Sequence, residues 1–195
     1  MATWKSRGLR GSLFEDIINR TNEVYKERGT ALVQKIPTPI TPIDIDRQSR
    51  HITLAYFDQK STVDYIGIAQ GVALCFDCKE CATDTFALQN IHEHQYNYMK
   101  EFEKQGGVAF LLIYFSHREE IYFMNCREMA RFYDRGSDEA MQNGTGRRSF
   151  RYDELDPRFI YEMPNEPFIN YLEYVNDYLE LCEQEEASEN SEKKC

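Results

Sequence analysis

The sequence has 195 residues, with 33 Asp and Glu against 23 Lys and Arg and a formal net charge of −10, and this length suits one domain of ordinary size. Its hydrophobic content of 42% excludes a chain that is disordered throughout, and its apolar runs are too short to cross a membrane. The negative charge leaves a nucleic-acid partner possible, because residues 151–195 hold 13 acidic and 4 basic side chains, while residues 1–150 hold 20 and 19.

The N-terminal part predicts a helix, a strand and a projecting segment. Residues 12–28 place apolar side chains on one face at helical spacing, and residues 30–36 are a short strand candidate. The prolines of residues 37–42 exclude helix and central strand and predict a stiff, extended segment. Residues 43–55 then alternate isoleucine or leucine with polar residues, which fits either a projecting β-ribbon or an ordinary loop or edge hairpin.

The rest of the chain predicts strands and helices in turn. The expected strands are 61–68, 72–79, 108–115 and 120–125, the expected helices are 86–104, 127–133 and 167–183, and 136–148 is a mobile loop. This order indicates an α/β fold with one mixed sheet flanked by helices. We expect a single domain over residues 1–182, with a stalk insertion at about 37–55, and an acidic, disordered tail over residues 183–195.

Two carboxylates and a lysine form the most informative pattern. Asp77 and Lys79 alternate along one strand and therefore project from the same face of the sheet. If the strands 61–68 and 72–79 pair, Asp64 lies near Asp77. Paired carboxylates repel unless a cation or a proton separates them, so this pattern suits Mg²⁺ or Mn²⁺ and metal-dependent phosphodiester hydrolysis. The alternative is a salt-bridged strand end, since Asp-x-Lys also occurs by chance.

Two further residues are candidates for the same site, each with a purely structural alternative. Glu15 on the first helix can lean over the sheet and complete a metal shell, or it can serve only as part of a capping box. Gln95 on the helix after the Asp-x-Lys strand can touch a phosphate or the attacking water, or it can satisfy a buried edge.

The six cysteines predict free thiols rather than disulfides or a zinc site. Residues 1–13 are polar and basic and lack an apolar signal segment, which favours a reducing compartment. Cys75, Cys78 and Cys81 recur every third residue, a period that does not hold three thiolates on one face of a strand.

Motifs along nearly the whole chain, from about Arg7 to about Leu181, match one known family. The matching segments are Arg7-Gly8, Phe14-Glu15, Thr21-Asn22, Lys35, Pro37-Thr38-Pro39, Ala55-Tyr56-Phe57, STVDYIG from Ser61, FDCKE from Phe76, LQNIHEHQ from Leu88, Arg147-Arg148-Ser149 and Asp153-Glu154-Leu155. The chain resembles the RecU family of Holliday junction resolvases, also called penicillin-binding protein-related factor A. Together these segments are far more specific than the Asp-x-Lys pattern.

The resemblance implies a restriction-endonuclease-like fold and a homodimeric nuclease that nicks four-way DNA junctions symmetrically with Mg²⁺ or Mn²⁺. It implies metal ligation by Asp64 and Asp77 and catalysis by Lys79, with Glu15 and Gln95 in support. It also implies a cytoplasmic, nucleoid-associated protein acting in recombination and repair, possible contact with strand-exchange or branch-migration proteins, and no membrane partner.

The resemblance further implies that segment 37–55 is a stalk that enters the junction centre. The candidate DNA-binding residues are Arg7, Lys35, Arg47, Arg50, Arg147 and Arg148. Of the two stalk arginines, Arg47 is the better match to the family's functional arginine and Arg50 is the close alternative.

Two departures from the family affect what we expect. Asp77 stands where the family usually has Glu, which shortens the carboxylate arm by one methylene, and Asp44 and Asp46 make the stalk less basic. We expect these changes to affect the affinity for DNA more than the nuclease activity. The alternatives are a junction-binding scaffold with little or no cleavage, or a protein-interaction domain without salt-dependent DNA binding.

Overall fold

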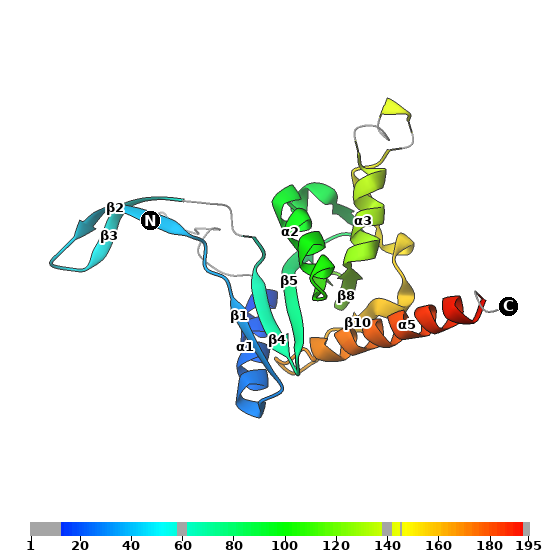
Figure 1. The fold of residues 1–195 in the computed structure, drawn as a ribbon. Helices are drawn as coiled ribbons and strands as arrows, with labels where there is room; N and C mark the ends of the chain where they lie inside the picture. The colour runs from blue at the N-terminus through cyan, green and yellow to red at the C-terminus, as the bar shows by residue number, and fades with distance from the viewer. Residues whose placement is uncertain (1–12, 58–61, 138–141, 145, 193–195) are drawn as a thin grey trace.

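The structure is a computed structural model that describes residues 13–57, 62–137, 142–144 and 146–192. Its main sheet has six strands in the order β1-β4-β5-β7-β8-β10 (Figure 1). These strands are β1 (Ala31–Lys35), β4 (Tyr65–Ala69), β5 (Val72–Cys81), β7 (Val108–Phe115), β8 (Glu120–Asn125) and β10 (Ile160–Glu162). Only β5 and β7 pair in parallel, so the sheet is mixed, as predicted.

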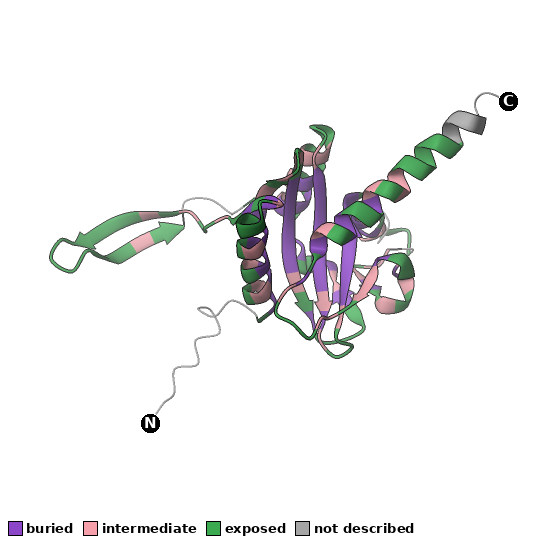
Figure 2. Ribbon diagram, turned by 90° about the horizontal axis from the view of Figure 1, so that it is seen from below, coloured by how far each residue is buried: buried purple, intermediate pink, exposed green. Residues whose placement is uncertain are grey.

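Four helices cover the two faces of this sheet. They are α1 (Leu13–Arg28), α2 (Glu93–Lys104), α3 (Cys126–Arg135) and α5 (Tyr171–Glu192). On one face, Tyr171 at the start of α5 packs on Phe76 and Phe110 and donates a hydrogen bond to Asn22 of α1 at 2.6 Å. On the other face, α2 and α3 pack on β7. The fully buried strands β7 and β8 form the centre of the core (Figure 2).

A two-stranded hairpin projects from the body of the molecule. It consists of β2 (Ile40–Asp46) and β3 (His51–Phe57), which pair only with each other in the described part of the chain. Nearly every residue of the hairpin is exposed (Figure 2). This confirms the projecting, proline-led stalk that the sequence predicts and decides between the ribbon and the ordinary loop.

The predicted helix over 86–104 is wrong in its first part. Its residues form β6 (Thr85–Ala87) and the short 3-10 helix η1 (Leu88–Asn90) before α2 begins at Glu93. The reason is a long-range contact, because β6 pairs with β9 (Ser149–Arg151), and Phe86 stacks on Phe150 at 5.0 Å. Tertiary pairing of this kind overrides local helical periodicity.

The C-terminal part also differs from the expectation. The last helix begins at Tyr171 rather than at residue 167 and continues to Glu192, into the segment expected to be a disordered tail. Residues 183–188 are exposed, so the extension has no apolar face to bury. Its Glu, Gln and Ala residues are strong helix formers, which lets the helix propagate past its packed part. Part of the expected mobile loop, at 138–141 and 145, lies outside the described residues.

Candidate functional site

The turn between β4 and β5 brings the two predicted carboxylates together. Gln70 and Gly71 both have positive φ angles, of 49° and 94°, as tight hairpin turns require. Tyr65 is therefore directly opposite Phe76. The backbone N–H of Asp64, just before β4, donates a hydrogen bond to Asp77 Oδ1 at 2.6 Å. The expected strand pairing and the proximity of Asp64 to Asp77 are confirmed.

Asp77 is a charged side chain at the centre of an apolar sheet. It is fully buried, and Lys79 Nζ lies 2.9 Å from its Oδ2. The two residues share a face of β5, because they are two positions apart on the strand. Oδ2 has no aligned hydrogen-bond donor among the described residues, so the Lys79 ion pair is its compensation. Burying such a pair costs several kcal/mol of desolvation per ion, and this cost calls for a functional reason.

Asp64 shows the electrostatic strain of this arrangement. Its pKa is raised to about 6, mainly by burial and next by the neighbouring Asp77 carboxylate, while Lys79 opposes the shift. Glu15 also raises the pKa of Asp64, and Lys35 lowers it. Four charged side chains thus shift the pKa of Asp64, and the structure brings all five residues together: Glu15, Lys35, Asp64, Asp77 and Lys79.

Glu15 and Lys35 form the outer part of this group. Lys35 Nζ lies 2.6 Å from Glu15 Oε2 and 5.9 Å above the ring of Tyr65. Burial lowers the pKa of Lys35, but the Glu15 carboxylate outweighs this and the net shift is upward. Lys35, expected to bind DNA, thus has a carboxylate partner beside the candidate site. Its role in DNA binding stays a prediction.

Gln95 occupies the first turn of α2 rather than a position two turns into a helix. It is buried, and its Oε1 accepts a hydrogen bond from the backbone N–H of His92 at 3.2 Å. This is a helix-capping contact, so the structural alternative for Gln95 is present whatever else the residue does. The rings of His92, which precedes the helix, and of His94 in its first turn stack at 5.4 Å.

The expected DNA-binding arginines fall in three places. Arg47 and Arg50 lie exposed in the turn at the tip of the β2–β3 hairpin, and Arg50 has a positive φ of 57°. Arg147 is held by Glu154 at 3.1 Å, and Arg148 lines a pocket beside His92. Arg7 lies outside the described residues.

The donor set at Asp64 and Asp77 fits a hard divalent cation. Within the described ranges, no three His, Cys, Asp or Glu side chains gather closely enough to hold a metal together. Two carboxylates do fit, because Asp77 Oδ2 is buried without a hydrogen bond and Asp64 is partly desolvated. Oxygen ligands of this kind are what Mg²⁺ and Mn²⁺ prefer.

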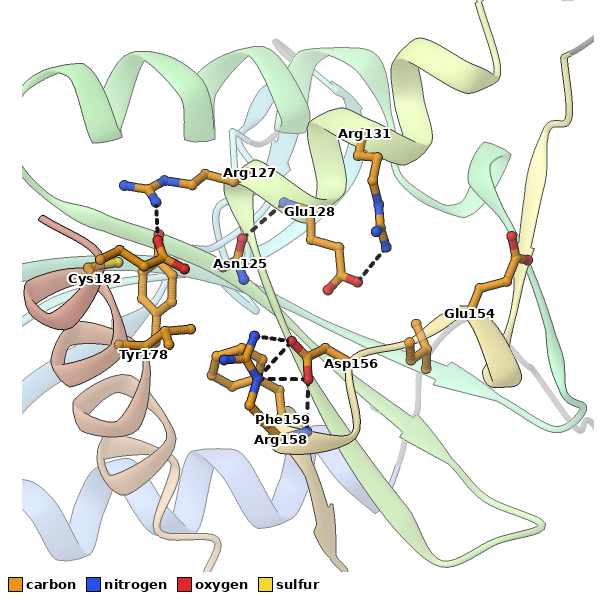
Figure 3. A pocket seen from close by; sticks show the side chains of 13 residues that line it. Asn125, Arg127, Glu128, Arg131, Glu154, Asp156, Arg158, Phe159, Tyr178 and Cys182 are labelled. Carbon is orange, nitrogen blue, oxygen red and sulfur yellow. Dashed lines mark hydrogen bonds and ion pairs between the residues drawn. The ribbon is translucent and has the colours of Figure 1, made fainter. Parts of the chain in front are cut away.

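A separate pocket of about 510 Å³ lies between α3 and α5, and the sequence did not point to it. Figure 3 shows three arginines in its lining, each facing a carboxylate. Arg127 contacts Glu185, Arg131 contacts Glu128 and Arg158 contacts Asp156, at 3.2, 2.9 and 2.6 Å. Each of these three arginines thus already has a carboxylate partner.

The described part of the chain has neither a membrane-spanning helix nor a bonded cysteine. No helix among the described residues is long and apolar enough to cross a membrane. The cysteines of the described part are free thiols, and Cys75, Cys78, Cys81 and Cys126 are buried, in agreement with the prediction of packing thiols.

Comparison with known proteins gives a consistent result. The model of the family RecU, described as recombination protein U, matches residues 9–177. The Holliday junction resolvase RecU of Pediococcus pentosaceus is 36% identical over 89% of this chain and 86% of its own length. The Holliday junction resolvase RecU of Lactococcus lactis is 39% identical over 90% of this chain and 80% of its own length.

Among solved structures, Archaeoglobus fulgidus Hjc, a Holliday junction resolvase from an archaeal hyperthermophile, matches with a TM-score of 0.35 and 10% identity. The match covers 60% of this chain and 78% of that one.

Proposed function

The chain belongs to the RecU family, and from this premise we propose that it is a metal-dependent, structure-selective DNA endonuclease that resolves Holliday junctions by paired, symmetric nicks. The relatives with this name cover most of the chain, and the family model covers residues 9–177, which include β4, β5 and the projecting hairpin. The proposed setting is recombination and repair in the cytoplasm, at the nucleoid.

The observation that carries this proposal is the buried ion pair of Asp77 and Lys79 with Asp64 bonded to it. A buried salt bridge is weak evidence for stability, because an apolar pair of the same volume is often as stable. Charges kept in such a place are more typical of functional sites. The resemblance to the family implies roles in the chemistry for the same three residues.

Asp64 and Asp77 would hold the cation, with Glu15 as a third carboxylate close enough to act on Asp64 electrostatically. When bound, Mg²⁺ or Mn²⁺ would offset the charge of the scissile phosphate and lower the pKa of a coordinated water. Asp77 stands where the family usually has Glu, and the backbone N–H of Asp64 donates a hydrogen bond to its Oδ1. The shorter arm is thus held in one position.

Lys79 is the residue we assign to the reacting phosphate. Its side chain is 17% exposed, and its ammonium faces Asp77 Oδ2. An ammonium fixed in a low-dielectric site can orient the attacking water or stabilise charge that develops on the phosphate, and it need not reorganise to do so. Gln95 and Glu15 would support the site from α2 and α1.

Substrate recognition would fall to the hairpin and to a second copy of the chain. A four-way junction offers phosphates in a particular geometry, so shape rather than base sequence would be read. The exposed tip with Arg47 and Arg50 is the described part that reaches farthest from the sheet (Figure 1). Symmetric nicks require two sites, hence a homodimer. Strand-exchange or branch-migration proteins are possible further partners.

The direct test is incubation of the protein with a labelled four-way junction and, separately, linear duplex of the same sequence, each with Mg²⁺ or Mn²⁺. We expect paired nicks in the junction, an intact duplex and no product with a chelator. An Asp77→Asn protein should bind the junction and leave it uncut. Binding without any nicking by the wild-type protein would instead support the scaffold function.

A further inference from the structure

A pocket of about 490 Å³ lies where the start of α2 meets the end of α3. It is lined by apolar, aromatic and polar residues, among them Leu88, Ile91, Tyr133, His92, Glu93 and Arg148. We call it the α2–α3 pocket. None of the residues assigned to the cation or to the reacting phosphate lines it, so its function is separate from theirs.

Hydrogen bonds tie together the segments that enclose the α2–α3 pocket. The Tyr133 hydroxyl donates to the carbonyl of Ile91, and the backbone N–H of Leu88 donates to the carbonyl of Arg148 at 3.1 Å. The ring of Tyr133 also stacks on that of Tyr96 in α2, with the ring centres 4.2 Å apart. The pocket is therefore preformed by contacts of the fold, as ligand sites usually are.

The direction of α2 places the pocket beside the candidate site. The chain enters α2 after β5 and leaves it for β7, which is parallel to β5, so the helix runs antiparallel to both strands. Tyr98 of α2 lies near Cys75 of β5, because the two interact electrostatically. Asp77 is about 6.6 Å farther along β5. His94 lies about 6 Å before Tyr98 on the same face of the helix, and it is therefore level with Asp77.

Two stacked imidazoles connect the candidate site with the α2–α3 pocket. The half-buried ring of His94 and the ring of His92 are parallel within 12°, and their centres are 5.4 Å apart. His92 is exposed and lines the pocket. The stack thus runs from the level of Asp77 into the pocket and ends on an exposed aromatic side chain.

The lining of the pocket favours a nucleobase over a phosphate. Glu93 and Arg148 carry opposite charges, so together they supply no excess of the positive charge that phosphate binding requires. Apolar walls, an aromatic ring and a few polar groups suit a flat heterocycle with donors and acceptors at its edge. The volume is also within the usual range of small-molecule sites, about 300–1,000 Å³.

We infer that the α2–α3 pocket receives one unpaired nucleobase of the strand that is cut, stacked on His92 beside the phosphate held at Asp77 and Lys79. This inference rests on the proposed function, which supplies that phosphate. Stacking on an aromatic side chain accepts any base, so the pocket reads no sequence. Unpairing costs least where a base has already lost its partner or its stacking. Strands exchange partners at the branch point of a junction, so a junction fills the pocket more readily than a linear duplex.

The test is a double-mutant cycle on junction affinity, measured by gel shift with a chelator so that no strand is cut. One change removes a base: a set of junctions carries a single abasic position, at each nucleotide near the branch point in turn. The other change is His92→Asn, which removes the ring and keeps a residue suited to begin a helix. At one position, base removal should weaken binding by the wild type about tenfold and leave binding by His92→Asn unchanged.

Two further variants separate stacking from a purely structural role of His92. His92→Phe keeps a flat ring without the ring nitrogens and should recover most of the affinity that His92→Asn loses. His117→Asn is the matched control, because His117 is also exposed but lies in the turn between β7 and β8, and it should bind like the wild type. A 5-iodouracil at the sensitive position should cross-link on irradiation to a peptide that contains His92 or Tyr133.

Equal losses on base removal in the wild type and in His92→Asn, or no sensitive position near the branch point, would overturn the inference. A cross-link only to residues outside the pocket would do the same. Because the affinity is measured without cleavage, a coupling to His92 in a protein that never nicks a junction would refute the endonuclease and keep the pocket. Nicking without this coupling would do the reverse, and a protein that does not bind junctions would refute both.

Discussion

Two antiparallel strand pairs of the molecule, β2–β3 and β4–β5, are alike in being hairpins and differ in almost everything else. The β4–β5 pair lies between β1 and β7, and most of β5 is buried. The β2–β3 pair has no third strand among the described residues and is exposed along its length. Isolated two-stranded hairpins are marginally stable in water.

The difference indicates a division of labour. The buried pair fixes Asp64, Asp77 and Lys79 through neighbours on every side, as chemistry at one phosphate requires. The exposed pair presents Arg47 and Arg50 on a unit that can adapt to a large substrate. Substitutions in the first should therefore affect cleavage, and substitutions in the second should affect binding.

The largest effect is expected at the buried pair. Lys79→Ala should lower the rate of junction nicking by about 100-fold or more and leave junction affinity nearly unchanged, because Lys79 is only 17% exposed. Single-turnover kinetics with saturating protein would measure this. Lys104→Ala is the control, since Lys104 also pairs with a carboxylate, Glu101 at 2.7 Å, but on the surface. A Lys79→Ala protein that nicks at the wild-type rate would remove the distinction between the two strand pairs.

At the exposed pair, the double variant Arg47→Ala/Arg50→Ala should weaken junction binding by about tenfold at moderate salt. It should also reduce the slope of log affinity against log salt by about one for each lost phosphate contact. A gel-shift series across salt concentrations would show both effects. Lys26→Ala on α1 removes an exposed cation elsewhere and should change neither. An unchanged salt slope in the hairpin variant would mean that its tip does not meet phosphate.

A smaller effect concerns stability and pH. The folded-state pKa of Asp64 is raised from 3.8 to about 6, so the folded protein binds this proton more tightly than the unfolded chain. Ionised Asp64 therefore lowers stability as pH rises through this window. Asp64→Asn should unfold at a higher temperature than the wild type at pH 7 with a chelator, and the gain should vanish below about pH 4.

The contradicting result for Asp64 is a variant that is destabilised at pH 7. Such a protein would show that the Asp64 carboxylate stabilises the folded state by more than the free energy lost in burying it. Asp16→Asn on exposed α1 surface serves as the control, because no desolvated carboxylate is removed there.

The smallest effect is local to the hairpin turn. Arg50 adopts a φ of 57°, a left-handed conformation that costs a side chain about 1 kcal/mol relative to glycine. Arg50→Gly should slow hydrogen exchange of the hairpin amides by about fivefold relative to Arg50→Ala, which removes the same charge and keeps the backbone strain. Equal exchange in both variants would show that the turn does not limit hairpin opening.

The sequence predicted the parts of the fold that depend on local pattern. The strongly apolar run after Gly71 predicted β5, the alternation of side chains along a strand put Asp77 and Lys79 on one face, and the prolines identified the base of the hairpin. The helix expected from residue 86 failed because Phe86 meets Phe150, a contact across more than sixty positions that no local pattern reports. The short strand β10 was missed because its three residues carry too little periodicity to indicate a strand.

For the candidate site, the sequence predicted that Asp64, Asp77 and Lys79 lie together but did not predict the contacts between them. The spacing of Asp64 and Asp77 showed that they could meet, but the bond from the Asp64 N–H depends on the exact register set by the Gly71 turn. The pairing of Lys35 with Glu15 joins a strand to a helix. The direction of each side chain at that junction follows from tertiary packing alone.

The register of β5 against β7 determines which side chains of β5 reach the candidate site. Asp77 pairs with Leu111 and Lys79 with Ile113, and a slip of one residue would replace the charged pair on that face by Phe76 and Cys78. Correct pairing of β5 with β7 is therefore a condition for activity, since a chain with these strands out of register would lack both the carboxylate and the ammonium on that face.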